Sequence, residues 1–346
     1  MSTVDKSSPK PLLSVQAIVL AGIIWAVLAL LFFLLFSVPP QGKSHPLWYS
    51  LGTLVFEEVA YFSAAVLCLR NWRSPQIVSG RNVWLGIGLG MLSYFLGNLI
   101  FGYWELGLRR EPDISPADFF FILTYIFLGI GMSSAVFSRK LSLEIWQWGC
   151  VVLITAVGIA IAAWVALPSP PGTATNLLLP PAYAQSAPAN PSKPAPSKPA
   201  PQKPTPTVGN PPQNSQNAEA AKAEQTAQAP EWAVSMENLL RPLKDPVNLF
   251  YLLCDLFLLV LATMLLLAFW GGRFSQSWRM IAAAAFCLYI ADTWFKYATR
   301  DPNYQTGSLP EVFWVFTGVL FGIGAVLEYD VSSRARSRSG SRRRTA

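Results

Sequence analysis

Long apolar runs constrain this chain more than any other feature of its sequence. A helix needs about 20 mostly apolar residues to cross the roughly 30 Å hydrocarbon core of a bilayer. The 346 residues are 52% hydrophobic and only 13% charged, so the runs predict an all-α integral membrane protein with about eight transmembrane helices. The predicted spans are 12–36, 47–69, 83–104, 117–137, 147–167, 247–271, 278–297 and 310–328.

The predicted spans divide the chain into five segments. Residues 1–11 are expected to form a cytoplasmic tail, and residues 12–167 to hold the first four spans together with the fifth. Residues 168–245 are expected to form a linker outside the cytoplasm. Residues 246–330 then hold the last three spans, and residues 331–346 form a basic cytoplasmic tail.

The linker at 168–245 has a composition that does not support a folded core. It is rich in proline, alanine and lysine, and later in alanine, glutamine and asparagine. Segments of this kind stay extended and disordered because they bury too little apolar surface. The stretch Ala182-Tyr183-Ala184 also fits the Ala-x-Ala site of exported proteins, so cleavage into two associated halves is an alternative.

Basic residues beside the spans predict the orientation of the chain in the membrane. Arg70, Arg73, Arg81 and Arg279 fall on the same side as both termini, which are therefore expected in the cytoplasm. An arginine cluster after the last span suits anionic lipid headgroups, and nucleic acid is the less favoured partner. The cluster consists of Arg334, Arg336, Arg338, Arg342, Arg343 and Arg344.

Two distant segments share residues at fixed spacing. Ser115 and Asp118 precede the fourth span in the way that Ser308 and Glu311 precede the eighth, and Asn98 aligns with Asp292. The pattern predicts two tandem four-helix repeats, which share one orientation because each has an even number of spans. Matching glycines follow in both copies, at Gly129 and Gly131 and at Gly322 and Gly324.

The acidic residue at the start of each of these two spans fits a helix cap. In a capping box the serine side-chain oxygen accepts a hydrogen bond from a backbone amide of the first turn. The acid three residues later accepts a hydrogen bond from the backbone amide of the serine. Ser115 with Asp118 and Ser308 with Glu311 have this spacing, and Trp314 follows the second pair. Contact with a ligand or an ion at the outer surface is the alternative role of the two acids.

Polar and ionisable side chains also fall inside the predicted spans. Such residues are costly in a bilayer and usually face a cavity or a partner. Lys296 follows Asp292 by one helical turn, so a salt bridge on one helix face is the structural alternative for Asp292. The candidates for contact with a ligand or a proton are Glu57, Glu58, Asn98, Asp255 and Asp292.

The sequence offers few ligands for a metal. His45 is the one histidine, and the cysteines lie in or at the ends of apolar spans without a Cys-x-x-Cys pair. We expect the cysteines to pack as small apolar residues, and we expect no metal or haem site. A lipophilic ligand remains compatible with the composition. The four cysteines are Cys68, Cys150, Cys254 and Cys287.

The two repeated segments resemble the multi-span sensory module found at the N-terminus of many bacterial diguanylate cyclases and phosphodiesterases. The resemblance implies a membrane-embedded sensor. Arginines rather than an output domain follow the last span, so no cyclic-dinucleotide chemistry is expected. The residues that carry the resemblance are Glu105, Pro112, Ser115, Ala117 and Asp118, then Asp292, Tyr304, Gly307, Glu311 and Trp314.

These features favour a non-enzymatic, multi-pass sensory module that binds a small or lipophilic ligand, or a membrane protein, between its two halves. A scaffold, subunit or assembly factor of a larger photosynthetic or respiratory membrane complex is one alternative. A secondary transporter is another, although the sequence lacks the paired mid-membrane helix breaks typical of such proteins. The linker resembles exported segments of cyanobacterial proteins, which implies a bacterial plasma membrane or a thylakoid membrane.

Overall fold

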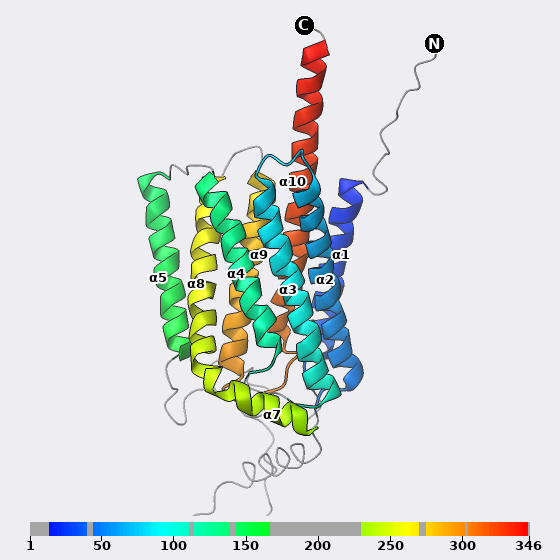
Figure 1. The fold of residues 1–346 in the computed structure, drawn as a ribbon, viewed down its shortest axis with the longest axis vertical. Coiled ribbons are helices and arrows are strands. Elements are labelled where there is room, and N and C mark those ends of the chain that lie inside the picture. Colours follow the sequence, from blue (N-terminus) through cyan, green and yellow to red (C-terminus); the bar gives the residue numbers. More distant parts are fainter. Residues whose placement is uncertain are drawn as a thin grey trace, which may run out of the picture.

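The computed structural model describes residues 14–39, 44–110, 114–138, 143–166, 230–269, 275–301 and 304–344, and these residues form helices and short connections without a strand. Three short helical turns join the longer helices: η1 (Tyr103–Gly107), η3 (Arg241–Leu243) and η4 (Leu309–Glu311). The long helices are shown in Figure 1. They are α1 (Val15–Phe36), α2 (Leu47–Arg73), α3 (Arg81–Gly102), α4 (Ala117–Ser138), α5 (Ile145–Ala166), α7 (Glu231–Leu240), α8 (Lys244–Ala268), α9 (Ser275–Ala298) and α10 (Val312–Arg344).

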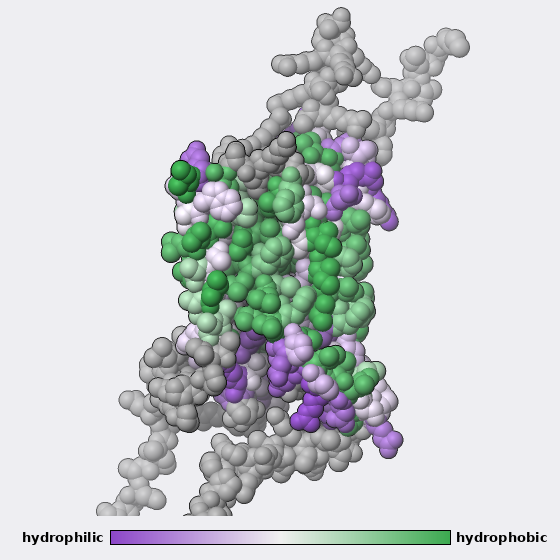
Figure 2. Space-filling view, turned by 60° about the vertical axis from the view of Figure 1, so that its left-hand side comes forward, coloured by the Kyte–Doolittle hydropathy of each residue, from purple (hydrophilic) through white to green (hydrophobic). Residues whose placement is uncertain are grey.

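The helical membrane class predicted from the apolar runs is confirmed. Seven helical stretches of the described chain are long and apolar enough to cross a membrane, and apolar side chains cover the middle of the face shown in Figure 2. The remaining predicted span corresponds to α9, which runs alongside the others in the bundle (Figure 1). Its sequence is less apolar because it carries Arg279, Asp292 and Lys296.

Six of the helices form a closed ring. Going round it, α2 contacts α3, α3 contacts α4, α4 contacts α8, α8 contacts α9, α9 contacts α10, and α10 returns to α2. The two remaining long helices are peripheral, because α1 packs chiefly on α10 and α5 packs chiefly on α8. They lie at opposite edges of the bundle in Figure 1. The ring interior is therefore enclosed by helices from both halves of the sequence.

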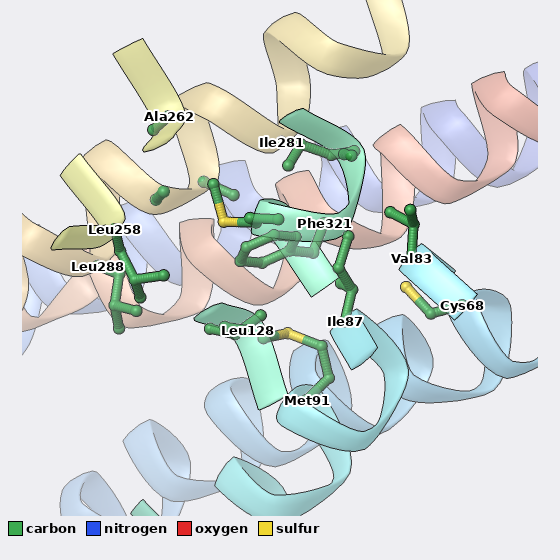
Figure 3. Close-up of a cluster of buried hydrophobic side chains, with 14 of the residues drawn as sticks. Cys68, Val83, Ile87, Met91, Leu128, Leu258, Ala262, Ile281, Leu288 and Phe321 are labelled. Atoms are coloured by element: carbon green, nitrogen blue, oxygen red, sulfur yellow. The ribbon is translucent and has the colours of Figure 1, made fainter. Parts of the chain in front are cut away.

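The apolar core fills the ring toward the end at which α10 leaves the bundle. Ile87, Met91, Leu128 and Phe321 converge there from three helices (Figure 3). All four side chains are fully buried. Helix α7 lies across the other end of the bundle (Figure 1).

The segment predicted as a disordered linker, 168–245, is corrected in its last part. Residues 231–245 are helical, comprising α7, η3 and the start of α8. Glu237 anchors α7 to the bundle, since it forms an ion pair with Arg110 and accepts a hydrogen bond from Trp104 at 3.1 Å. Ala233 of α7 is also fully buried. The part of the predicted linker before Pro230, including the Ala-x-Ala stretch, lies outside the described residues.

Candidate functional site

A cavity of about 510 Å³ lies inside the six-helix ring. All six ring helices contribute to its wall, and so do η1, η4 and the loop between α9 and η4. The cavity reaches the surface near Arg300 and Asp301, which are exposed. Its volume falls in the range of about 300–1,000 Å³ that is usual for small-molecule sites.

Glu57 and Asn98 form the first polar contact of the cavity wall. They come from α2 and α3, and the Asn98 amide donates a hydrogen bond of 3.0 Å to Oε2 of Glu57. Glu57 is 7% exposed. Within the described part of the chain, this is the one hydrogen bond recorded for the Glu57 carboxyl group, and it leaves Oε1 without a donor. The sequence proposed both residues as candidates, and the structure brings them together.

A second polar cluster joins α4, α8 and α9. The hydroxyl of Tyr125 lies 2.6 Å from Oδ1 of Asp255 and 2.5 Å from Oδ2 of Asp292. The indole of Trp314 donates a hydrogen bond of 2.8 Å to Oδ1 of Asp292. Asp255 is 3% exposed, and Asp292 lines the cavity. Two more of the predicted candidates therefore share one network.

The salt bridge expected between Asp292 and Lys296 on one face of α9 is replaced by a pair between helices. Lys296 lies 3.4 Å from Oδ2 of Asp255, a residue of α8. Asp292 is turned instead toward the hydroxyl of Tyr125 and the indole of Trp314. Spacing along the helix permits the pair within α9, but the neighbouring helix offers Lys296 a buried carboxylate.

Glu311 closes the cavity at the start of α10. It forms a capping box with Ser308, and it also accepts hydrogen bonds from the amide of Gly307 at 2.7 Å and from the hydroxyl of Tyr304. Gly307 has φ 103°, a left-handed conformation that glycine adopts without strain. Because Glu311 also lines the cavity, the two roles considered for it are compatible in one position.

Asp118 has the corresponding place at the start of α4. Its Oδ2 accepts the amide of Ser115 at 2.7 Å, and its Oδ1 accepts the hydroxyl of Tyr251 at 2.7 Å. The Ser115 oxygen accepts the amide of Ala117 at 3.2 Å. Asp118 is thus a cap that lines the cavity wall as well.

Glu58 and the arginine cluster lie away from the cavity. Glu58 does not line it, and within the described residues its two buried oxygens have no hydrogen-bond partner. Arg334 forms an ion pair with Asp330 of the same helix. The side chains of the other five arginines, at 336, 338 and 342–344, lie outside the described residues.

Sequence reasoning missed the tyrosines of the site. Tyr125 bridges two aspartates and Tyr251 contacts Asp118, whereas in the sequence both appear as ordinary aromatic residues of apolar spans. It also missed Thr306, which donates a hydrogen bond to Glu105 at the rim. The only local signal is a hydroxyl inside a span, because such a group needs a partner when it is buried.

Arg110 links the site to α7. Its guanidinium donates to both oxygens of Glu237, with 2.7 Å from Nε to Oε1. These hydrogen bonds raise the pKa of Arg110 above its ordinary value. Trp232 of α7 also packs edge-on against Trp104, with ring centroids 5.4 Å apart. The helix is therefore fixed to the bundle at and just after η1, a segment that lines the cavity.

The wall of the cavity carries acidic and aromatic side chains. Among the described residues, no group of three or more histidine, cysteine, aspartate or glutamate side chains is arranged to hold a metal ion. Carboxyls outnumber cationic side chains around the cavity. The carboxyls are those of Glu57, Glu105, Asp118, Asp292, Asp301 and Glu311, and the cations are those of Lys244, Lys296 and Arg300.

No family model, no curated protein and no solved structure matches the chain.

Proposed function

We propose that this chain is a non-enzymatic, multi-pass membrane module of sensory type that binds a small ligand between its two halves. The observation that carries the proposal is the cavity of about 510 Å³ enclosed by all six ring helices. Three helices of the ring come from the first half of the sequence and three from the second. A ligand in the cavity would contact both halves at once.

The packing supports the internal duplication on which this proposal builds. A Cβ atom at Gly131 would lie 3.0 Å from the Val83 carbonyl oxygen and 3.0 Å from the Ile87 amide nitrogen. At the matching Gly324, a Cβ atom would lie 3.2 Å from the Ser277 carbonyl oxygen and 3.0 Å from Ile281 Cγ1. Val83 and Ile87 precede Asn98 by the same intervals as Ser277 and Ile281 precede Asp292. This equivalence supports two tandem four-helix repeats.

Helix α10 connects the cavity with the opposite end of the bundle. It follows Glu311 directly and carries Trp314, both of which line the cavity. The same helix continues to Arg344, beyond the end of the bundle (Figure 1). A ligand that shifts the start of a rigid helix also shifts its far end, which is the behaviour required of a sensory element.

The orientation proposed for the module places both termini in the cytoplasm of a bacterial cell, in the plasma membrane or a thylakoid membrane. Arg70, Arg73 and Arg279 lie at the end of the bundle from which α10 emerges, which agrees with the excess of positive charge on cytoplasmic loops. The arginine cluster at 334–344 would then lie near anionic headgroups of the inner leaflet.

The proposal is tested by native mass spectrometry of the full chain, extracted from its own membrane in mild detergent. We expect a small molecule to copurify with the protein. A Thr53→Trp variant, which fills the cavity from α2, should lose that molecule. A Val55→Trp variant is the matched control, because Val55 is 51% exposed on the outside of the same helix.

The outcomes separate the proposal from its alternatives. A chain without any bound molecule but with stoichiometric membrane-protein partners would favour the scaffold or assembly factor. Gradient-driven uptake into vesicles would favour the secondary transporter. Turnover of a substrate that is abolished by Glu57→Gln would contradict the non-enzymatic assignment.

A further inference from the structure

The second half of the molecule contains a buried acid with its own cation. Asp255 of α8 is 3% exposed, and Nζ of Lys296 lies 3.4 Å from its Oδ2. The lysine also lies over the ring of Tyr251, 5.6 Å from the centroid. A buried carboxylate is costly unless a partner compensates its charge, and here the chain itself provides that partner.

The first half contains the corresponding acid. Glu57 occupies on α2 the place that Asp255 occupies on α8. The amide of Asn98 on the next helix, α3, donates a hydrogen bond to Glu57. In the second half Asp292, which matches Asn98, shares the hydroxyl of Tyr125 with Asp255. The interval that separates Asn98 from Asp292 also pairs Gly102 with Lys296. The first half therefore has a glycine where the second half has a lysine.

This glycine lies in the wall of the cavity. Glu57, Asn98 and Gly102 all line it. Oε1 of Glu57 receives no hydrogen bond from any group that the structure describes, although the side chain is 93% buried. The carboxylate in the first half thus lacks the cation that its counterpart in the second half has, and it faces a volume large enough to admit one.

We propose that the cavity binds an organic ligand with a protonated amine, and that the ammonium group lies against Glu57 in the way that the ammonium of Lys296 lies against Asp255. This inference rests on the proposed function and specifies its ligand class. The excess of carboxyls over cations around the cavity favours a positively charged ligand. Oppositely charged groups attract one another more strongly in a cavity of low dielectric constant than in water.

The aromatic wall favours an organic cation over a bare metal ion. Phe121, Tyr251, Phe295 and Trp314 line the cavity, and aromatic faces attract ammonium groups. A volume of about 510 Å³ exceeds what a bare ion fills. A molecule with an apolar body and one ammonium group would match both the aromatic side chains and Glu57.

The first test measures binding to the full chain in lipid nanodiscs by calorimetry. The probes are phenethylamine, phenyltrimethylammonium and 1,4-diaminobutane, with 2-phenylethanol as the uncharged counterpart and sodium and potassium ions as bare cations. We expect at least one amine to bind and 2-phenylethanol not to bind. Glu57→Gln should weaken amine binding about 30-fold or more, as expected when a buried charge loses its partner.

Glu58→Gln is the matched control, because Glu58 is adjacent in sequence but does not line the cavity. Amine affinity should be unchanged in this variant. Failure of all three amines to bind, or equal binding of 2-phenylethanol, would overturn the inference. Saturable binding of sodium or potassium that depends on Glu57, without amine binding, would replace it with a bare-ion site.

The second test needs no added ligand. Gly102→Lys places a lysine at the position equivalent to Lys296, and Gly102→Met adds a side chain of similar length without charge. A Cβ atom at this position would lie 2.9 Å and 3.1 Å from the two methyl carbons of Leu54, so both variants require the same shift of that flexible side chain. We expect the lysine variant to melt at a higher temperature than the methionine variant, and the difference should disappear when Glu57→Gln is added.

The two tests distinguish failure of this inference from failure of the proposed function. If native mass spectrometry finds a neutral or anionic molecule that Thr53→Trp expels, the cavity binds a ligand but the amine assignment is wrong. If the lysine and methionine variants melt alike with Glu57 present, Glu57 does not favour a positive charge introduced at position 102. Loss of amine binding in Gly102→Lys but not in Gly102→Met would support the assignment directly.

Discussion

At the scale of single residues, the carboxylate of Glu311 accepts several hydrogen bonds at the start of α10. Glu311 is 3% exposed and accepts hydrogen bonds from Ser308, Gly307 and Tyr304. Every one of these groups is a donor, so the site requires an acceptor with two oxygens. A glutamine has one acceptor oxygen and would turn an N–H group toward one of the donors.

Glu311→Gln is therefore expected to lower the free energy of unfolding by about 1–3 kcal/mol, the usual cost of leaving buried donors without partners. The measurement is equilibrium unfolding in mixed micelles. Glu231→Gln is the control, because Glu231 is exposed in the first turn of α7. Equal stability of the two variants would show that the hydrogen bonds to Glu311 are not needed for the fold.

His45 gives a second prediction at this scale. Its ring stacks on Tyr49 with centroids 4.7 Å apart, and partial burial lowers its pKa below the ordinary value. A lowered pKa in the folded state means that protonation favours the unfolded state. The contribution of His45 to stability is complete above about pH 6.5, the unfolded value, and is lost as the pH falls toward the lower folded value.

Because His45 is the one histidine of the chain, NMR of protein labelled in histidine and purified without a histidine tag should give one titrating signal. We expect its pKa below about 6.5. His45→Gln should remove part of the acid sensitivity of the unfolding free energy. A signal that titrates above the ordinary value would contradict the prediction.

At the scale of elements, α3 and α4 approach each other through glycine. A Cβ atom at Gly86 would lie 2.7 Å from Cα of Gly131 and 2.9 Å from the carbonyl oxygen of Phe127. Both are backbone atoms, so they cannot move without separating the helices. Small residues at such contacts let membrane helices pack closely, which is why this part of the ring depends on two glycines.

Gly86→Ala should consequently destabilise the protein by about 1–3 kcal/mol or more, the usual range for overpacking, and should disturb the cavity that the same two helices line. Gly149→Ala is the matched control, since a Cβ atom there meets nothing within 4 Å. That variant should be unchanged or stabilised by up to about 1 kcal/mol, the difference in helix propensity. Thermal unfolding of both variants in the same detergent makes the comparison.

At the scale of the whole molecule, the two ends of the bundle differ in charge and in what extends from them. α10 extends from one end and α7 lies across the other (Figure 1). If both termini are cytoplasmic, Leu239→Cys on α7 should react with a membrane-impermeant maleimide in intact cells, and Arg334→Cys should react only after permeabilisation. Leu239 and the Arg334 side chain are 72% and 71% exposed, which makes them comparable.

Both cysteines are introduced into a chain whose Cys68, Cys150, Cys254 and Cys287 have been replaced by serine or alanine. The reverse labelling pattern would show that the chain has the opposite orientation, with the cavity entrance on the cytoplasmic side. Labelling of both positions in intact cells would mean that the bundle does not separate the two ends across a membrane.

The sequence by itself predicted the long apolar helices of this protein. Apolar runs of the right length predicted the long helices, because a bilayer requires helical backbone wherever the chain crosses it. The cap at Glu311 was also predictable, since its hydrogen bonds to Ser308 join residues a few positions apart. The prediction failed for α7, where the last part of a low-complexity segment was assigned to the linker although residues 231–240 have apolar side chains at helical spacing.

Only the tertiary structure decided which polar groups meet. The sequence named Glu57, Asn98, Asp255 and Asp292 as candidates, but it did not indicate that Tyr125 joins the two aspartates or that Lys296 pairs with Asp255 rather than with Asp292. A helix in a membrane is apolar on most sides, so its sequence does not fix how it rotates about its own axis or which helix it contacts. Those choices come from the packing of the ring, where close approach at glycines and the need of each buried polar group for a partner select one arrangement.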